Sequence, residues 1–184
     1  MKVIGINTSP RDGSNNKIAI QTALDAAAAK GAETEIFDTC KMNISGCQGD
    51  NYCKAHGGKC AIDDDMTKIY AAIEEADAII FGSPIYFGNI TGQGKLVIDR
   101  LYAYFMSDEH KELFSNKKVS IIGTNGVAPK EACLPALNDI LEAFGMLGFQ
   151  KGEVIDLPDN NDLKAIEGKD DQLAEAKTLG ENLI

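Results

Sequence analysis

The loop from residue 8 to residue 16 holds the side chains best suited to binding an anion. Its sequence is Thr-Ser-Pro-Arg-Asp-Gly-Ser-Asn-Asn, and it lies between an apolar run, Val3–Ile6, and a predicted helix, Lys17–Lys30. A strand that leads through such a loop into a helix presents unpaired backbone N–H groups beside hydroxyls, amides and one guanidinium, which suits a phosphate. Ser and Asn at a helix start are also common as plain caps. The density of polar groups, with Arg11 among them, favours the anion site.

A second loop, residues 83–91, is unusually apolar and follows another predicted strand, Ala78–Phe81. Exposing its Pro, Ile, Tyr and Phe side chains at a sheet edge is costly unless they pack against something. A flat aromatic ligand would cover them, with Gly88 permitting close backbone approach and Asn89 offering hydrogen bonds. A subunit contact would cover them equally well, and the two interpretations are compatible. A third loop, Thr124–Gly126, is on its own only a turn signal.

Four of the five cysteines, Cys40, Cys47, Cys53 and Cys60, fall within one short segment. An odd count in a chain of this length does not suit a secreted disulfide framework. Clustering in a reducing compartment instead favours a metal or redox role for the segment. Cys133 stands alone on a later predicted helix, where a small core side chain is the simpler interpretation.

Composition limits the classes of function. The chain has 184 residues, 25% charged and 44% hydrophobic, which predicts one globular domain spanning residues 1–184. Its formal net charge of -10 disfavours nucleic acid or an anionic membrane as a partner. Neither a membrane-spanning run nor a secretory signal is recognisable in the sequence, so we expect a cytoplasmic protein.

The elements that must position these loops alternate between strand and helix. Further strands are predicted at 33–38, 118–123 and 152–157, and further helices at 64 onward, 93–106, 132–147 and the C-terminus. Residues 40–63 interrupt this rhythm as an insertion loop that is longer than a connection needs. Alternation with short apolar strands predicts an α/β fold whose parallel sheet is covered on both faces. The three loops described above, residues 8–16, 83–91 and 124–126, should then lie together at the carboxyl ends of the strands.

Neither of two common nucleotide-binding motifs is found in the sequence. The first loop has no G-x-G-x-x-G fingerprint. Gly94-Lys95 is superficially similar to the end of a P-loop, but Leu96 replaces the required Ser or Thr. Nucleoside triphosphate chemistry is therefore disfavoured.

The motifs together resemble a known family, and the resemblance covers nearly the whole chain in the right order. The chain is similar to the NAD(P)H-dependent FMN reductases of the flavodoxin-like superfamily, in particular to the iron–sulfur flavoprotein branch. The resemblance implies a three-layer sandwich with a five-stranded parallel sheet, order 2-1-3-4-5, and FMN at the sheet edge. The matching segments are Ser9–Arg11, Ser14–Asn16, Asp64–Met66, Gly82–Asn89, Gly92–Gln93 and Ile98–Arg100.

By position, the resemblance implies three groups of FMN-binding residues. The phosphate group comprises Ser9, Arg11, Ser14, Asn15 and Asn16, although family members often have Thr at the last position. The group that lines the isoalloxazine comprises Pro84, Ile85, Tyr86, Phe87, Gly88 and Asn89. The group that closes the other side of the ring comprises Thr124, Asn125 and Gly126. No catalytic side chain is assigned, because hydride arrives directly at the flavin.

The same branch implies a [4Fe–4S] cluster bound by Cys-x2-Cys-x2-Cys and one later cysteine. Cys47, Cys53 and Cys60 occupy the first, third and fourth positions, but Asp50 stands where the second cysteine belongs. Thiolates are the usual cluster ligands, and a carboxylate replaces one only occasionally. The preferred alternative is that these thiols pack in a loop without metal. No Cys-x2-Cys pair supports a structural zinc site.

The leading functional prediction is an FMN-dependent oxidoreductase. It would move electrons from NAD(P)H or a ferredoxin-type donor to an acceptor. The alternatives are an electron-transfer carrier without its own turnover, and a metal- or redox-responsive binding protein that uses the Cys40–Cys60 segment. A homodimer or homotetramer is expected from the apolar second loop and from Leu101, Tyr102, Tyr104 and Phe105 after it, unless those side chains join the core.

Overall fold

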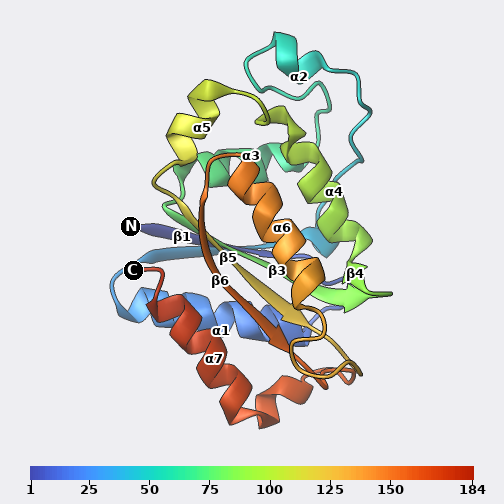
Figure 1. Cartoon of the computed structure of the whole chain (residues 1–184), viewed down its shortest axis with the longest axis vertical. Coiled ribbons are helices and arrows are strands. Elements are labelled where there is room, and N and C mark those ends of the chain that lie inside the picture. The colour runs from blue at the N-terminus through green and yellow to red at the C-terminus, as the bar shows by residue number, and fades with distance from the viewer.

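A computed structural model describes all residues, 1–184, and its centre is a parallel sheet (Figure 1). The order of the strands is β2-β1-β3-β5-β6, and a short strand, β4, pairs antiparallel with β3. Counting only the parallel strands in chain order, this is the predicted order 2-1-3-4-5; β4 was not predicted. The bounds are β1 Lys2–Asn7, β2 Glu33–Asp38, β3 Ala78–Tyr86, β4 Asn89–Ile90, β5 Lys118–Thr124 and β6 Gln150–Leu157.

Helices cover both faces of the sheet, which confirms the predicted three-layer sandwich (Figure 1). One face carries α1, Asn15–Ala29, and α7, Asp170–Glu181, around a core that includes Ile20 and Leu179. The opposite face packs around Phe81 and Phe144. Its helices are α3 Met66–Glu75, α4 Gly92–Arg100, α5 Asp108–Phe114 and α6 Leu134–Met146. The apolar strands therefore bury side chains on both sides, as their continuous hydrophobic pattern predicts.

Four short helical segments complete the chain, and one of them changes a predicted element. They are η1 Thr39–Lys41, α2 Tyr52–Ala55, η2 Leu101–Ala103 and η3 Ala165–Gly168. The helix expected at 93–106 ends as α4 at Arg100 and is followed by η2. The carbonyl oxygens of Tyr102 and Phe105 accept hydrogen bonds from Lys54 Nζ at 2.6 and 2.5 Å. Because this lysine comes from the 40–63 insertion, the sequence pattern of the helix alone could not reveal the break.

The register of the sheet brings four strand ends to one edge. Asn7 lies opposite Gly82, Pro84 lies opposite Thr124, and Thr124 lies opposite Leu157. The loops that follow β1, β3, β5 and β6 therefore emerge side by side. The part of the 40–63 insertion around α2 lies away from these loops, at the top of Figure 1, whereas the start of the insertion, Cys40 and Met42, lies beside Pro10.

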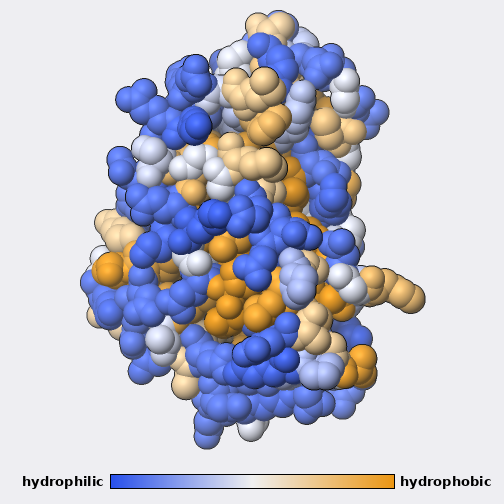
Figure 2. Space-filling view, in the orientation of Figure 1, coloured by the Kyte–Doolittle hydropathy of each residue, from blue (hydrophilic) through white to orange (hydrophobic).

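The visible surface is mostly hydrophilic (Figure 2). Apolar atoms gather near the middle of that view, where α6 and β6 lie, and on a projection at the right edge, where Figure 1 places the β3–β4 turn. None of the helices combines the length and hydropathy that a membrane crossing requires.

Candidate functional site

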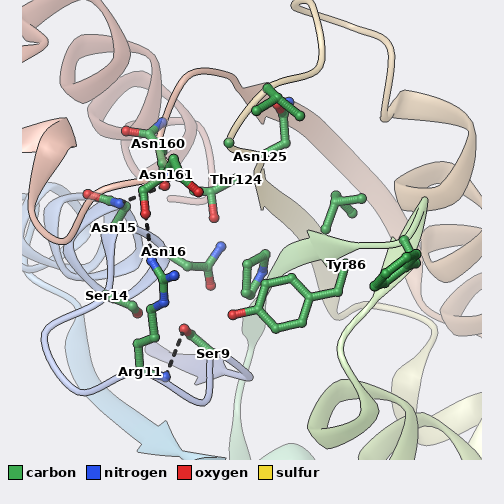
Figure 3. A pocket seen from close by; sticks show the side chains of 15 residues that line it. Ser9, Arg11, Ser14, Asn15, Asn16, Tyr86, Thr124, Asn125, Asn160 and Asn161 are labelled. Carbon is green, nitrogen blue, oxygen red and sulfur yellow. Dashed lines mark hydrogen bonds between the residues drawn. The ribbon is translucent and has the colours of Figure 1, made fainter.

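A cavity of about 300 Å³ opens at the carboxyl ends of β1, β3 and β5 (Figure 3). Every residue that the sequence predicted for cofactor binding lines it, except Gly88 and Asn89. Three residues that were not predicted, Val127, Asn160 and Asn161, also line it. The predicted residues in the lining are Ser9, Arg11, Ser14, Asn15, Asn16, Pro84, Ile85, Tyr86, Phe87, Thr124, Asn125 and Gly126.

Gly88 and Asn89 lie beside the cavity because they complete a tight hairpin. Phe87 and Gly88 form the two-residue turn between β3 and β4, with φ angles of 49° and 78°. Both central residues of such a turn need positive φ, which Gly adopts freely and Phe does not. Asn89 Oδ1 accepts the backbone N–H of Ile90 at 2.8 Å. The turn also leaves the Phe87 side chain fully exposed.

The start of α1 presents donors toward one end of the cavity. The backbone N–H groups of Ser14, Asn15 and Asn16 have no hydrogen-bond partner in the protein. Ser14 Oγ accepts the N–H of Lys17 at 3.1 Å, and Ser9 Oγ accepts that of Arg11 at 3.3 Å. Each hydroxyl therefore keeps its own proton free to donate. Free N–H groups, two O–H donors and the positive end of a 15-residue helix form an anion site.

The amide side chains of Asn15 and Asn16 are used inside the protein. Asn15 Nδ2 donates to the carbonyls of Asn160 and Asp162, at 3.0 and 2.7 Å, and its Oδ1 accepts the N–H of Ile166 at 3.0 Å. Asn16 Nδ2 donates to the carbonyl of Ile122 at 3.0 Å, whereas its Oδ1 is buried without a hydrogen-bond partner in the protein. These residues therefore offer a ligand their backbone N–H groups, which residue types alone do not distinguish from side-chain contacts.

A glycine in β3 makes the position of Asn16 possible. A Cβ atom on Gly82 would lie 2.5 Å from Asn16 Oδ1 and 2.5 Å from the Ile20 side chain. The first turn of α1 thus packs directly against the backbone of β3. This close approach fixes the free N–H groups of α1 beside the second loop.

Arg11 is an exposed residue that bridges two loops at the rim of the cavity. Its Nη1 donates to the carbonyl of Asn161 at 2.6 Å. In Figure 3 the side chain runs past Ser14 on the side of the cavity opposite Tyr86. Arg11 therefore joins the first loop to the loop that follows β6, with its positive charge beside the anion site.

A buried network of hydroxyls holds the first and second loops together. Thr91 Oγ1 donates to the carbonyl of Thr8 at 2.7 Å and caps α4 by accepting the N–H of Gly94. Thr8 Oγ1 donates to the carbonyl of Gly82 at 2.9 Å, and Ser83 Oγ accepts the N–H of Thr91. With both loops fixed, the phenol group of Tyr86 points toward Ser9 and Asn16 (Figure 3).

The third loop is held from behind by a buried carboxylate. Asp156 Oδ1 accepts from Asn125 Nδ2 at 2.9 Å, and its other oxygen accepts the N–H of Cys133 at 3.1 Å. Asn125 Oδ1 in turn accepts the N–H of Ala128 at 2.8 Å. Cys133 is a buried core residue, as predicted, and burial raises the pKa of its thiol.

The cysteine segment forms a separate and much smaller hollow. Cys47, Asp50, Cys53 and Cys60 line a space of about 10 Å³, the size of a single water molecule. No three His, Cys, Asp or Glu side chains in the protein converge closely enough to hold a metal ion. Cys40 lies elsewhere, beside Pro10. The segment as folded therefore does not fit the [4Fe–4S] cluster that the resemblance implies.

A buried ion pair holds this segment in place. Arg100 donates to both oxygens of Asp64, at 2.8 and 3.2 Å, and to the carbonyl of Ser45 at 2.9 Å. Burial of Asp64 raises the pKa of its carboxyl, but hydrogen bonds from Arg100, Ser45 and Met66 outweigh that effect and lower it. Arg100 Nε lacks a partner and is buried at the wall of the cysteine hollow, where one water molecule would satisfy it.

Asn160 and Asn161 are the functional residues that the sequence analysis missed. They follow the last strand in the run Pro-Asp-Asn-Asn-Asp, residues 158–162. Such a run marks a loop, and the carboxyl end of a parallel strand lies at the binding edge of the sheet. That combination could have placed them in the site.

Comparison with known proteins supports the fold first. The structure is similar to that of an NAD(P)H:quinone oxidoreductase from Methanothermobacter marburgensis, with a TM-score of 0.77 over 100% of this chain and 96% of the other. The sequence identity is 16%, so this similarity concerns the fold, which is flavodoxin-like.

Sequence comparison then identifies the family. The chain belongs to the NADPH-dependent FMN reductase family, whose model matches residues 1–158. An iron-sulfur flavoprotein from Archaeoglobus fulgidus is 33% identical, over 96% of this chain and 80% of the relative. An iron-sulfur flavoprotein from Methanocaldococcus jannaschii is 45% identical, over 54% of this chain and about half (51%) of the relative's length. The predicted family and fold are thereby confirmed.

The cavity is suited to the FMN that the family description names. Anion donors stand at the start of α1, and Pro84, Ile85 and Tyr86 at the end of β3 line another wall of the cavity. FMN needs hydrogen-bond donors for its phosphate and an apolar wall for its aromatic ring system, and one cavity provides both.

Proposed function

We propose that this protein is an FMN-dependent oxidoreductase that passes electrons from NAD(P)H, or from a ferredoxin-type donor, to a separate acceptor. One observation carries the proposal: free N–H groups at the start of α1 and the apolar wall at 84–87 line the same cavity. Membership of the NADPH-dependent FMN reductase family supports the oxidoreductase class and the cofactor.

Different residues of the cavity would bind the phosphate and the ring system of the cofactor. Backbone N–H groups of residues 14–16, with the hydroxyls of Ser9 and Ser14, would bind the phosphate. Pro84–Phe87 would contact one part of the ring system, and Thr124–Gly126 would close the cavity on another side. Bound FMN supplies hydride and electron transfer at its ring. The protein then needs no nucleophile, and neither the cysteine hollow nor an iron–sulfur cluster takes part in the proposed function.

A homo-oligomer is part of the proposal, and the exposed apolar surface supports it. Phe87 is fully exposed, Tyr102 and Met146 are exposed beside an apolar hollow between α4 and α6, and exposed groups of this kind are costly in a monomer. Leu101 and Tyr104 do not support it, because both are buried in the core. Light scattering should show a dimer or tetramer, and a monomer alone would remove this part.

The test of the proposed function is turnover by the FMN-loaded protein. We expect steady oxidation of NADH or NADPH in the presence of a quinone or dye acceptor, at a rate proportional to the protein concentration. Stoichiometric reduction without turnover by either nicotinamide or by reduced ferredoxin would instead identify an electron carrier. A protein that binds no flavin would contradict the proposal itself.

A further inference from the structure

Residues 158–166, here called the closing loop, form a fourth wall of the cavity. They follow β6 and begin at Pro158, the last residue that matches the family model. Asn160 and Asn161 line the cavity directly. In Figure 3 these residues stand over the start of α1, on the side away from Tyr86.

The first loop is bonded to the closing loop by two side chains. The Asn15 side chain makes three hydrogen bonds with the backbone of the closing loop. It donates to the carbonyls of Asn160 and Asp162 and accepts the N–H of Ile166. Arg11 Nη1 adds the fourth bond, to the carbonyl of Asn161 at 2.6 Å. Asn15 is 5% exposed, so its bonds are shielded from competing water.

The closing loop is also hydrogen-bonded to the third loop, residues 124–126. The N–H of Asn160 donates to the carbonyl of Asn125 at 2.7 Å, and its Nδ2 donates to Gln172 Oε1 at the same distance. A Cβ atom on Gly126 would lie 3.1 Å from the Asn161 side chain, so the two loops are in close contact. The closing loop is thus fastened to loops on either side of it and to α7.

We propose that the closing loop blocks the phosphate end of the cavity and thereby selects flavins that end in a phosphate monoester over dinucleotides. FMN ends at its phosphate, whereas FAD continues through a second phosphate into adenosine. For this extension to fit at the start of α1, the closing loop must move away from Arg11 and Asn15. The hydrogen bonds lost in that movement disfavour FAD. Asn15 is the positioning residue, since its side chain holds the loop and its free N–H faces the ligand.

This selectivity rests on the proposed function, and the experiment separates the two. FMN, FAD and riboflavin are titrated into the ligand-free wild-type protein, into Asn15→Ala and into the control Asn138→Ala. The side chain of Asn138 makes one exposed bond within α6, to the carbonyl of Leu134. Hydrogen exchange of the Ile166 N–H, which Asn15 Oδ1 accepts, reports release of the loop without any ligand.

We expect the wild-type protein and Asn138→Ala to bind FMN at least about 100-fold more tightly than FAD. In Asn15→Ala that ratio should fall about tenfold or more, with faster exchange at Ile166. General destabilisation would weaken both flavins alike and leave the ratio unchanged, which would overturn the positioning role. Equal wild-type affinity for FMN and FAD would overturn the selectivity while leaving the proposed function intact. Failure of every flavin to bind would instead contradict the proposed function.

Discussion

The flavin cavity and the cysteine segment both carry short motifs of the family that the chain resembles, and only the cavity has the geometry that its motif implies. The residues of the cavity follow the ends of four strands that the sheet register places next to one another. The cysteines come from an insertion whose path is fixed by one ion pair and by Lys54. A motif whose spacing coincides with the ends of parallel strands therefore predicts geometry, whereas a motif in an insertion predicts only which residues are near in sequence.

Removing the buried ion pair should have the largest effect, and it should lower stability without weakening FMN binding. Arg100→Ala leaves the buried Asp64 carboxylate without its cation, which costs about 3–5 kcal/mol of unfolding free energy. Urea denaturation measures the loss. FMN affinity in the folded variant should change less than about threefold, because Arg100 does not line the flavin cavity.

The matched control is Lys68→Ala, which removes an exposed ion pair with Asp65. Such pairs contribute about 0–1 kcal/mol, so its denaturation midpoint should hardly move. A large loss of FMN affinity in Arg100→Ala at native-like stability would show that the two regions are coupled.

A negative charge at the start of α1 should have the next largest effect, on the flavin cavity alone. Ser14→Asp retains a good helix cap, so folding should be preserved. The new carboxylate faces the phosphate, and FMN affinity should fall about 100-fold, or about 2.7 kcal/mol. Fluorescence titration with FMN measures this.

Riboflavin, which lacks the phosphate, should lose much less affinity for the same variant. Ser107→Asp serves as the control, because Ser107 caps α5 away from the cavity. Unchanged FMN affinity in Ser14→Asp would mean that the phosphate lies elsewhere.

The unfolding free energy should also depend on pH through the Asp64–Arg100 pair, and this effect should be smaller than the two described above. Hydrogen bonds from Arg100 and two backbone N–H groups lower the pKa of Asp64 in spite of its burial. A lowered folded-state pKa stabilises the protein fully above about pH 4, and the contribution is lost as the pH falls through that lowered pKa. Unfolding free energies measured from pH 6 to pH 2 should fall more steeply for the wild-type protein than for Asp64→Asn. Parallel curves would contradict the assignment.

Replacing the cysteines should have the smallest effect. The triple variant Cys47→Ser, Cys53→Ser, Cys60→Ser should keep its FMN affinity within about twofold, since none of the three thiols lines the flavin cavity. Anaerobically purified wild-type protein should contain flavin but no stoichiometric iron or sulfide. About three or four irons per chain would show that the hollow rearranges to hold a cluster.

The sequence predicted the layers and three walls of the cavity, because apolar strands that alternate with helices and the loops at strand ends are local signals. The order of the parallel strands came from the family resemblance. It could not predict the fourth wall, since Asn160 and Asn161 reach the site only through bonds to Arg11, Asn15 and Asn125. Nor could it show that the Asn15 side chain and Asn16 Nδ2 bond within the protein and leave the backbone N–H groups of both residues free. Both features depend on contacts between residues more than 100 positions apart.

The most direct test of the flavin cavity is an amide NMR titration of deuterated, ligand-free protein with FMN and then with riboflavin. FMN should shift the amide signals of Ser14, Tyr86 and Gly126 with one common affinity and leave those of residues 47–60 unmoved. Riboflavin should shift Tyr86 and Gly126 but not Ser14, because it carries no phosphate. An unmoved Ser14 signal at saturating FMN, or shifts confined to the cysteine segment, would contradict the assignment.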